Sequence, residues 1–423
     1  MSQSRLALLL VCGALTLGAQ TGAALDELLQ ARRYEELAAK LTQSGELAPE
    51  QRKYFEGALA LRQNRLDAAE RALVEAVNTR NPDLAGQKRQ TALTSPQVLN
   101  SMYMIATALI KLHQYSRAAY HYDMIDKIWG DNNPDIRASA RELGHTVALL
   151  KDVPRQTISI SGEATLAMSA EGYPIRIGEQ KFQAILDTGA SYSMISETTA
   201  KAWGVTPMAG TISVAGFSAK KFPAMPGVIP ELRIGTATLH NVVVMISPDK
   251  EAIVKAVLGY PVIAALGRLT FHQDGSLTIG AKSEGAAGGA PLWVGDQSLL
   301  ISLRTDAAPD GGSPRLFTLD TGAHNTFLTD NYLKEHRKDF SGEPDSMALL
   351  FGGGGLRPIP AYKAAKLPLW FGSTLVLLNG PHVLSATQGG EAQNYFGQIG
   401  IDVLGTFSSY TLDLVQMRFS ISK

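Results

Sequence analysis

The feature that most constrains this 423-residue chain is a motif that occurs twice in its C-terminal two-thirds. One copy runs from Phe182 to Ala190 (FQAILDTGA) and the other from Arg315 to Ala323 (RLFTLDTGA). A single Asp-Thr-Gly is expected by chance about once in several thousand positions at average composition, and on its own it most often forms a β-turn. Two copies, each after an apolar stretch and each followed by Ala, indicate an internal repeat instead.

A second matched element follows each copy at a similar distance. It is Val257-Leu258-Gly259 after the first copy and Gln398-Ile399-Gly400 after the second. From about Asp152 onward, short alternating stretches rich in Val, Ile and Thr are punctuated by Gly and Pro, which predicts an all-β region. A Gly/Ala-rich stretch from Gly280 to Gly289 has the composition of a linker. It divides the region into two halves, residues 155–282 and 290–423.

Residues 25–152 differ in composition, because Ala, Leu, Glu, Gln and Arg dominate and Gly is sparse. This predicts a helical domain. Segments 33–39, 65–73 and 114–120 resemble one another, since a large apolar residue precedes a small one by about one helical turn, which allows close helix packing. The pattern resembles the second helix of a tetratricopeptide repeat; a generic helical bundle fits equally well. A stack of hairpins would offer a groove for a peptide or protein partner.

Residues 1–24 have the order of an export signal: a short start that ends at Arg5, an apolar run from Leu6 to Gly18, and small residues up to Ala24. The run is shorter than the roughly 20 residues of a membrane span. We therefore expect a signal peptide, with a buried first helix as the alternative. The only cysteine, Cys12, lies in this run, so the mature chain would fold without disulfides. A periplasmic or secreted protein with no stable membrane span after cleavage is expected.

The duplicated motif, with its later apolar-apolar-Gly element, is similar to the signature of retropepsin-like and pepsin-like aspartic proteases across residues 155–423. Ala after the Gly resembles the retroviral and bacterial retropepsins. Two copies in one chain resemble pepsin, in which each lobe brings one Asp to a pseudo-twofold axis. The chain thus resembles a fused retropepsin dimer, as in exported bacterial members with helical N-terminal extensions. The resemblance implies a multidomain α + β protein: an α-helical hairpin array, then an all-β bilobal acid protease fold with a monomeric active site.

By this resemblance, Asp187 and Asp320 would be the catalytic carboxylates of an aspartic endopeptidase, a hydrolase of polypeptides that needs no cofactor. Two carboxylates about 3 Å apart cannot both ionise, so they share a proton and provide both a base and an acid; aspartic proteases are the standard example. The threonines would bond across the axis, and the glycines would let backbone N–H groups approach the carboxylates. The supporting loop residues are Thr188, Gly189, Ala190, Thr321, Gly322 and Ala323.

The neighbours of the motif carry two further expectations. Pepsin-type lobes often have Ser or Thr where Ala190 and Ala323 stand, and such a hydroxyl would lower the pKa of the carboxylate. Its absence predicts an activity optimum less acidic than pepsin's. Gly-containing segments 214–218 and 350–356 lie between each Asp and the later Gly. They predict flap hairpins, because no Lys-Ser/Thr follows the second one as in a phosphate loop.

Other functional classes fit less well. Lys+Arg and Asp+Glu both number 39, so bulk charge gives no support for binding nucleic acid or an acidic membrane. The eight histidines include no pair at metal-ligand spacing, so no metal site is expected. Ser191 and Ser193 lack the partner pattern of a Ser–His–Asp triad, and His324 is expected to be a polar loop residue. The alternative function is a catalytically silent peptide- or protein-binding module that uses the same cleft and the helical array.

Overall fold

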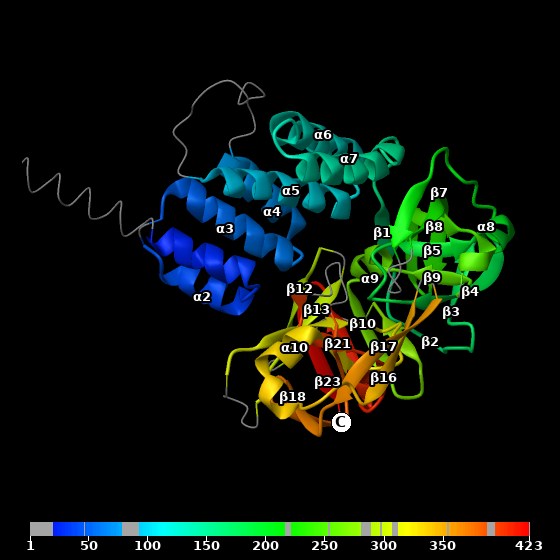
Figure 1. Ribbon diagram of the computed structural model, residues 1–423. Helices are drawn as coiled ribbons and strands as arrows, with labels where there is room; N and C mark the ends of the chain where they lie inside the picture. The colour runs from blue at the N-terminus through cyan, green and yellow to red at the C-terminus, as the bar shows by residue number, and fades with distance from the viewer. Residues whose placement is uncertain are drawn as a thin grey trace, which may run out of the picture. The chain divides into compact units, whose positions relative to one another are not determined.

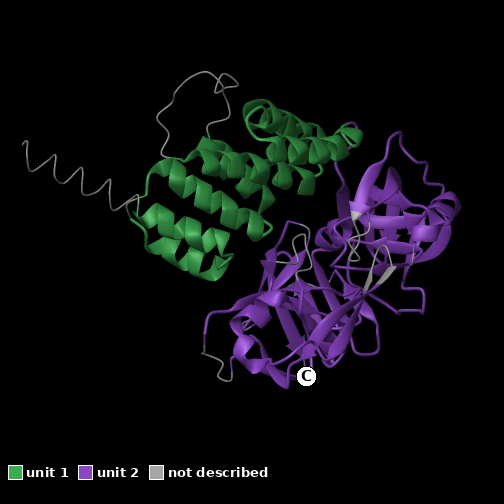
Figure 2. Cartoon of the chain, viewed as in Figure 1, with its two compact units in different colours: residues 1–151 green, residues 152–423 purple. Residues whose placement is uncertain are grey.

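The computed structural model describes residues 20–45, 47–77, 93–215, 221–252, 254–280, 289–296, 298–306, 312–352, 355–386 and 394–422. The chain divides into two compact units, residues 1–151 and residues 152–423 (Figure 2). The apolar run of the expected signal peptide, with Cys12, lies outside the described residues. So do residues 281–288 of the expected linker, and residues 216–218 and 353–354 of the two expected flap segments.

Unit 1 is a succession of helical hairpins (Figure 1). Its sequence starts helices with recognisable caps: Thr94 and Gln97 form a reciprocal capping box, and the Asn133 side chain accepts the backbone N–H groups of the next helix. Within the described residues, no helix is long and apolar enough to cross a membrane. The helices are residues 20–30, α2 (Tyr34–Gln43), α3 (Pro49–Arg62), α4 (Leu66–Val77), α5 (Ser95–Lys111), α6 (Tyr115–Ile125), the π-helical η2 (Asp126–Gly130) and α7 (Pro134–Leu149).

The three similar sequence segments begin α2, α4 and α6, and each follows the same kind of turn. One residue of each turn has positive φ: Arg32 at 57°, Asn64 at 56° and His113 at 55°. In each turn the next residue donates its N–H to the carbonyl five residues earlier, at 2.8–2.9 Å, which closes the end of the preceding helix. The helical prediction for this region is confirmed, and the three turns share one backbone geometry.

Unit 2 contains two β-rich halves. In the first half, the strands β8-β5-β9-β4-β3-β7 close into a ring, because β7 also pairs with β8. The elements of this half are β1 (Thr157–Ile160), β2 (Ala164–Leu166), β3 (Tyr173–Ile177), β4 (Gln180–Leu186), β5 (Ser193–Ser196), α8 (Glu197–Trp203), β6 (Ile212–Ala215), β7 (Lys221–Ile234), β8 (Ala237–Ser247), η3 (Asp249–Glu251), β9 (Ala256–Leu258), α9 (Tyr260–Leu266), β10 (Arg268–His272) and β11 (Leu277–Ile279).

The second half repeats the order of strands and short helices around its own motif, with an added two-stranded hairpin, β18–β19. Its elements are β12 (Ala290–Val294), β13 (Leu299–Leu303), β14 (Arg315–Leu319), β15 (Phe327–Leu328), α10 (Asp330–Glu335), η4 (Arg337–Asp339), β16 (Ser346–Gly352), β17 (Gly355–Lys363), β18 (Lys366–Phe371), β19 (Thr374–Asn379), β20 (His382–Leu384), β21 (Gly397–Ile399), α11 (Ile401–Leu404), β22 (Ser409–Asp413) and β23 (Arg418–Ser422).

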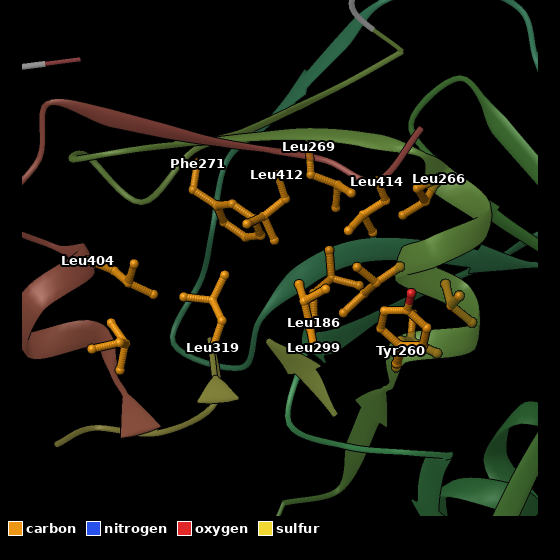
Figure 3. Packing of buried hydrophobic residues seen from close by; sticks show 14 of the residues in the cluster. Leu186, Tyr260, Leu266, Leu269, Phe271, Leu299, Leu319, Leu404, Leu412 and Leu414 are labelled. Carbon is orange, nitrogen blue, oxygen red and sulfur yellow. The ribbon is translucent and has the colours of Figure 1, made fainter. Parts of the chain in front are cut away.

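The two halves are joined by one sheet and one hydrophobic core. Strand β10 of the first half pairs antiparallel with β22 of the second, and the rings of Phe271 and Tyr410 stack at 4.9 Å. Leu186 and Leu319, the residues just before the two aspartates, belong to the same buried cluster (Figure 3). Helices followed by a β-rich region confirm the expected α + β multidomain class. The shared core fixes the ends of β4 and β14 relative to each other.

Candidate active site

Both Asp-Thr-Gly-Ala motifs form the loop that follows a strand whose last residue is buried. Strand β4 delivers Asp187 and pairs in parallel with β9, and β14 delivers Asp320 beside β21. The backbone N–H of Asp187 donates to the carbonyl of Leu258 at 3.1 Å, and that of Asp320 to the carbonyl of Ile399 at 3.0 Å. The later apolar-Gly elements therefore hold the start of each loop, where the sequence resemblance had placed them.

Backbone N–H groups turn toward each carboxylate in the same way. Gly189 N–H donates to Oδ1 of Asp187 at 2.8 Å, and Gly322 N–H donates to Oδ1 of Asp320 at 2.9 Å. A Cβ on Gly189 would lie 2.5 Å from Oδ2 of Asp320, and a Cβ on Gly322 would lie 2.5 Å from Cγ of Asp187. Each glycine thus leaves the space that the carboxyl group of the opposite half occupies.

The two threonines tie the loops together across the two halves. Thr188 Oγ1 donates to the carbonyl of Leu319 at 2.6 Å and accepts the N–H of Thr321 at 3.0 Å. Thr321 Oγ1 donates to the carbonyl of Leu186 at 2.9 Å and accepts the N–H of Thr188 at 3.1 Å. These four bonds form a closed reciprocal set, so neither loop can shift without breaking hydrogen bonds to the other half.

The two carboxyl groups lie close enough for each to influence the pKa of the other. Burial raises the pKa of Asp187, although the N–H of Gly189 and the neighbouring carboxyl oppose the shift. Burial, the charge of Asp187 and the hydrogen bond with it raise the pKa of Asp320 well above its ordinary value. Both side chains are crowded by protein atoms yet remain partly exposed to solvent. The pair can therefore hold one shared proton at a place that water can reach.

Two hydroxyl groups beside the loops were not identified as support residues from the sequence. Ser193 Oγ accepts the N–H of Gly259 at 3.1 Å, and Thr326 Oγ1 accepts the N–H of Gly400 at 2.9 Å. Each is the sixth residue after its aspartate, so an alignment of the two halves would have shown the shared hydroxyl. Ser193 is fully engaged in this structural bond.

A carboxylate found only in the second half was also missed. Asp402 accepts the Thr326 N–H at 2.9 Å and the Thr326 hydroxyl at 2.7 Å. At the equivalent place in the first half stands Pro261, which has no polar side chain. Asp402 therefore holds the Thr326 hydroxyl, whereas the equivalent hydroxyl, of Ser193, has only Pro261 at the corresponding position. In the sequence, the available signal for Asp402 was its place two residues after Gly400.

The remaining predicted residues lie around this centre. Ala190 and Ala323 continue the loops, and their carbonyls accept the N–H groups of Tyr260 at 2.8 Å and Ile401 at 2.9 Å. His324 is exposed on the second loop. The described residues of the expected flap segments belong to the paired strands β6 and β7 and β16 and β17. Across the described ranges, no group of three or more His, Cys, Asp or Glu residues could hold a metal ion.

The comparisons with known proteins agree with this geometry for the first half. Residues 173–262 match the family model described as aspartyl protease. The match runs from β3 to α9 and contains both the first Asp-Thr-Gly-Ala and the Leu258-Gly259 element. No curated protein matches the chain. The matched domain suggests a protease that acts on a polypeptide substrate.

Proposed function

We propose that the chain is an aspartic endopeptidase in which Asp187 and Asp320 act together on a water molecule. The observation that carries the proposal is that two carboxyl groups with raised pKa values lie beside each other on loops that reciprocal threonine hydrogen bonds tie together. A shared proton makes one group a base and the other an acid at the same pH, which peptide hydrolysis without a metal requires. The match to the aspartyl protease family over residues 173–262 supports the same reading.

In the proposed reaction, the pair starts with one proton. The ionised carboxylate takes a proton from water as the water oxygen attacks the peptide carbonyl carbon, and the protonated carboxyl gives its proton to the carbonyl oxygen. The tetrahedral intermediate then loses its C–N bond. The leaving nitrogen takes one proton from the pair, a hydroxyl of the intermediate returns one, and the pair again holds a single proton. Neither aspartate is the sole acid or base, because the pair titrates as a unit.

Export and partner binding belong to the same proposal. The order of residues 1–24 supports cleavage of a signal peptide and a periplasmic or secreted location in a bacterium. The repeated turns at Arg32, Asn64 and His113 support a tetratricopeptide-like reading of unit 1, which would hold a protein partner. N-terminal sequencing of the exported protein would test the first part, and an unprocessed Met1 would contradict it.

Cleavage of a denatured protein substrate tests the catalytic proposal. We expect the wild type to cleave it and both Asp187→Asn and Asp320→Asn to lose cleavage. The exposed Asp339→Asn, on the short turn η4, is the matched control and should cleave normally. Ala190 and Ala323 stand where a Ser or Thr hydroxyl would lower the pKa of the carboxylate. The pH–rate profile should therefore peak above pH 2. A wild-type protein that binds the substrate without cutting it would favour the silent binding module.

A further inference from the structure

Unit 1 contains a pocket of about 430 Å³ between α2, α3 and α4. Helices α2 and α4 both pack on α3, and residues of all three helices line the pocket. Alanines from all three helices line the pocket, and their small side chains leave the space open. A volume of this size lies within the range of specific ligand sites, roughly 300–1,000 Å³.

The base of the pocket is apolar and its rim is charged. Leu41, Leu59 and Ala60 form part of the lining and are each at most 6% exposed. On the rim, the side chains of Lys53 and Glu75 are 43% and 57% exposed. The pocket is therefore an open groove with an apolar floor, which suits an apolar side chain on a ligand that continues past the rim.

The charges on the rim are distributed unevenly along the groove. At one end, Lys53 lies 3.5 Å from the carboxylate of Glu56 and 3.3 Å from that of Glu75, so its charge is compensated. At the other end, Arg65 donates at 3.1 and 2.7 Å to the neutral side-chain oxygen of Gln63. Among the described residues, the structure shows no carboxylate paired with Arg65.

A second arginine extends this positive end toward the middle of the groove. Arg71 is exposed, and within the described part of the chain the structure shows no acidic partner for it. Helix α4 rises about 1.5 Å per residue, so the rim from Arg65 to Glu75 is about 15 Å long. That length accommodates about four or five residues of an extended chain.

We propose that this groove binds an extended acidic peptide segment of a partner protein. An apolar side chain of the segment rests on Leu41 and Leu59, and a neighbouring carboxylate pairs with Arg65 and Arg71. The open rim favours a peptide over a fatty acid, which shares the carboxylate and the apolar part but is best held by an enclosed cavity. The site does not depend on Asp187 or Asp320, so the protease proposal and this one can fail separately.

Fluorescence anisotropy with a defined probe tests the site. The full chain carries Asp187→Asn to prevent cleavage, and the probe is a fluorescein-labelled hexapeptide of alternating Leu and Glu. We expect saturable binding that weakens as salt rises. The double variant Arg65→Glu/Arg71→Glu should bind about tenfold more weakly, since two exposed charge pairs become repulsive. Both side chains are exposed, so thermal unfolding should be unchanged.

A control with the same change in net charge separates the groove from bulk electrostatics. Lys40 and Lys151 are exposed in the same unit and do not line the pocket, so Lys40→Glu/Lys151→Glu should bind the probe like the parent chain. A hexapeptide of alternating Leu and Lys should bind at least about tenfold more weakly than the acidic probe. The proposal is overturned if both double variants lose affinity equally, if the arginine variant keeps full affinity, or if laurate displaces the probe at lower concentration than unlabelled peptide does.

Discussion

The two halves of unit 2 are alike around the aspartates and differ in the residues that follow Gly259 and Gly400. Both have a buried strand end, a glycine N–H that donates to the carboxylate, and a threonine that bonds to the other half. In both, a hydroxyl oxygen also accepts the N–H of the later glycine. These parts set the position and the protonation of the two carboxyl groups. The two halves thus share the contacts that position the carboxyl groups and differ beyond them.

The difference begins directly after the later glycine of each half, Gly259 in the first and Gly400 in the second. In the second half, Asp402 binds both polar groups of Thr326. In the first half, Tyr260 is buried and Pro261 offers only its carbonyl, which accepts the side-chain N–H of Gln156 at 3.3 Å. The second half thus has one further polar contact, from Asp402, that Pro261 does not provide in the first half.

The largest effect should come from breaking the symmetry of the carboxyl pair itself. Asp187→Asn and Asp320→Asn should each lower kcat/KM by at least about 10²–10⁴-fold, because one group then loses its proton-transfer partner. The double variant should be no slower than either single one, since groups that act as a unit give non-additive losses. Steady-state cleavage of a labelled peptide would measure this. If one half alone sufficed, one of the single variants would keep most of its activity.

The next effect concerns the threonines that join the halves. Thr188→Val leaves the carbonyl of Leu319 and the N–H of Thr321 without their partner, so the free energy of unfolding should fall by about 1–3 kcal/mol. Thr321→Val should cost less, because Thr321 is partly exposed whereas Thr188 is fully buried. Urea unfolding would measure both changes.

Serine at these positions separates the hydroxyl group from the packing. Thr188→Ser and Thr321→Ser keep the hydrogen bonds and should cost less than the valine variants. The double valine variant should show coupling in a double-mutant cycle, since each threonine bonds to the other. Strictly additive losses would mean that the two loops are held independently.

A smaller effect should distinguish Asp402 from Pro261, the residues two positions after the later glycine of each half. Asp402→Ala removes the acceptor of two Thr326 hydrogen bonds, and because Asp402 is exposed, the loss should be about 1 kcal/mol. Asp402→Asn keeps an acceptor and is the control. Pro261→Ala, at the equivalent place, should change the free energy of unfolding by less. Equal losses at the two positions would contradict the assigned role of Asp402.

Much of this site could be predicted from the sequence because its signals are local. Apolar residues before each Asp-Thr-Gly-Ala indicated strand ends, and the repetition indicated two equivalent loops. The later apolar-Gly elements also lie where expected, beside Asp187 and Asp320. Which residues carry out catalysis stays a prediction, and so does the assignment of residues 155–282 and 290–423 as separate lobes.

Other features could not be predicted because they depend on tertiary contacts. Thr326 and Asp402 are far apart in sequence and meet only when β15 pairs with β21. The left-handed turns at Arg32, Asn64 and His113 carry no glycine to mark them. The groove over α3 depends on how alanines of three helices face one another, which the repeat pattern alone leaves open.

The last effect should appear in stability as a function of pH, and it has the same sign for both aspartates. Each pKa is raised above 3.8 in the folded state, so the stability that the group contributes is present below pH 3.8 and lost as pH rises through the folded pKa. An Asn side chain does not titrate, so Asn at either position removes this loss of stability with rising pH. Asp187→Asn and Asp320→Asn should therefore each gain more stability over the wild type at pH 7 than at pH 3, because burial raises the pKa of both carboxyl groups. Urea unfolding at pH 3 and pH 7 measures both. A gain that grows toward pH 3 would show that folding does not raise the pKa values of the carboxyl pair.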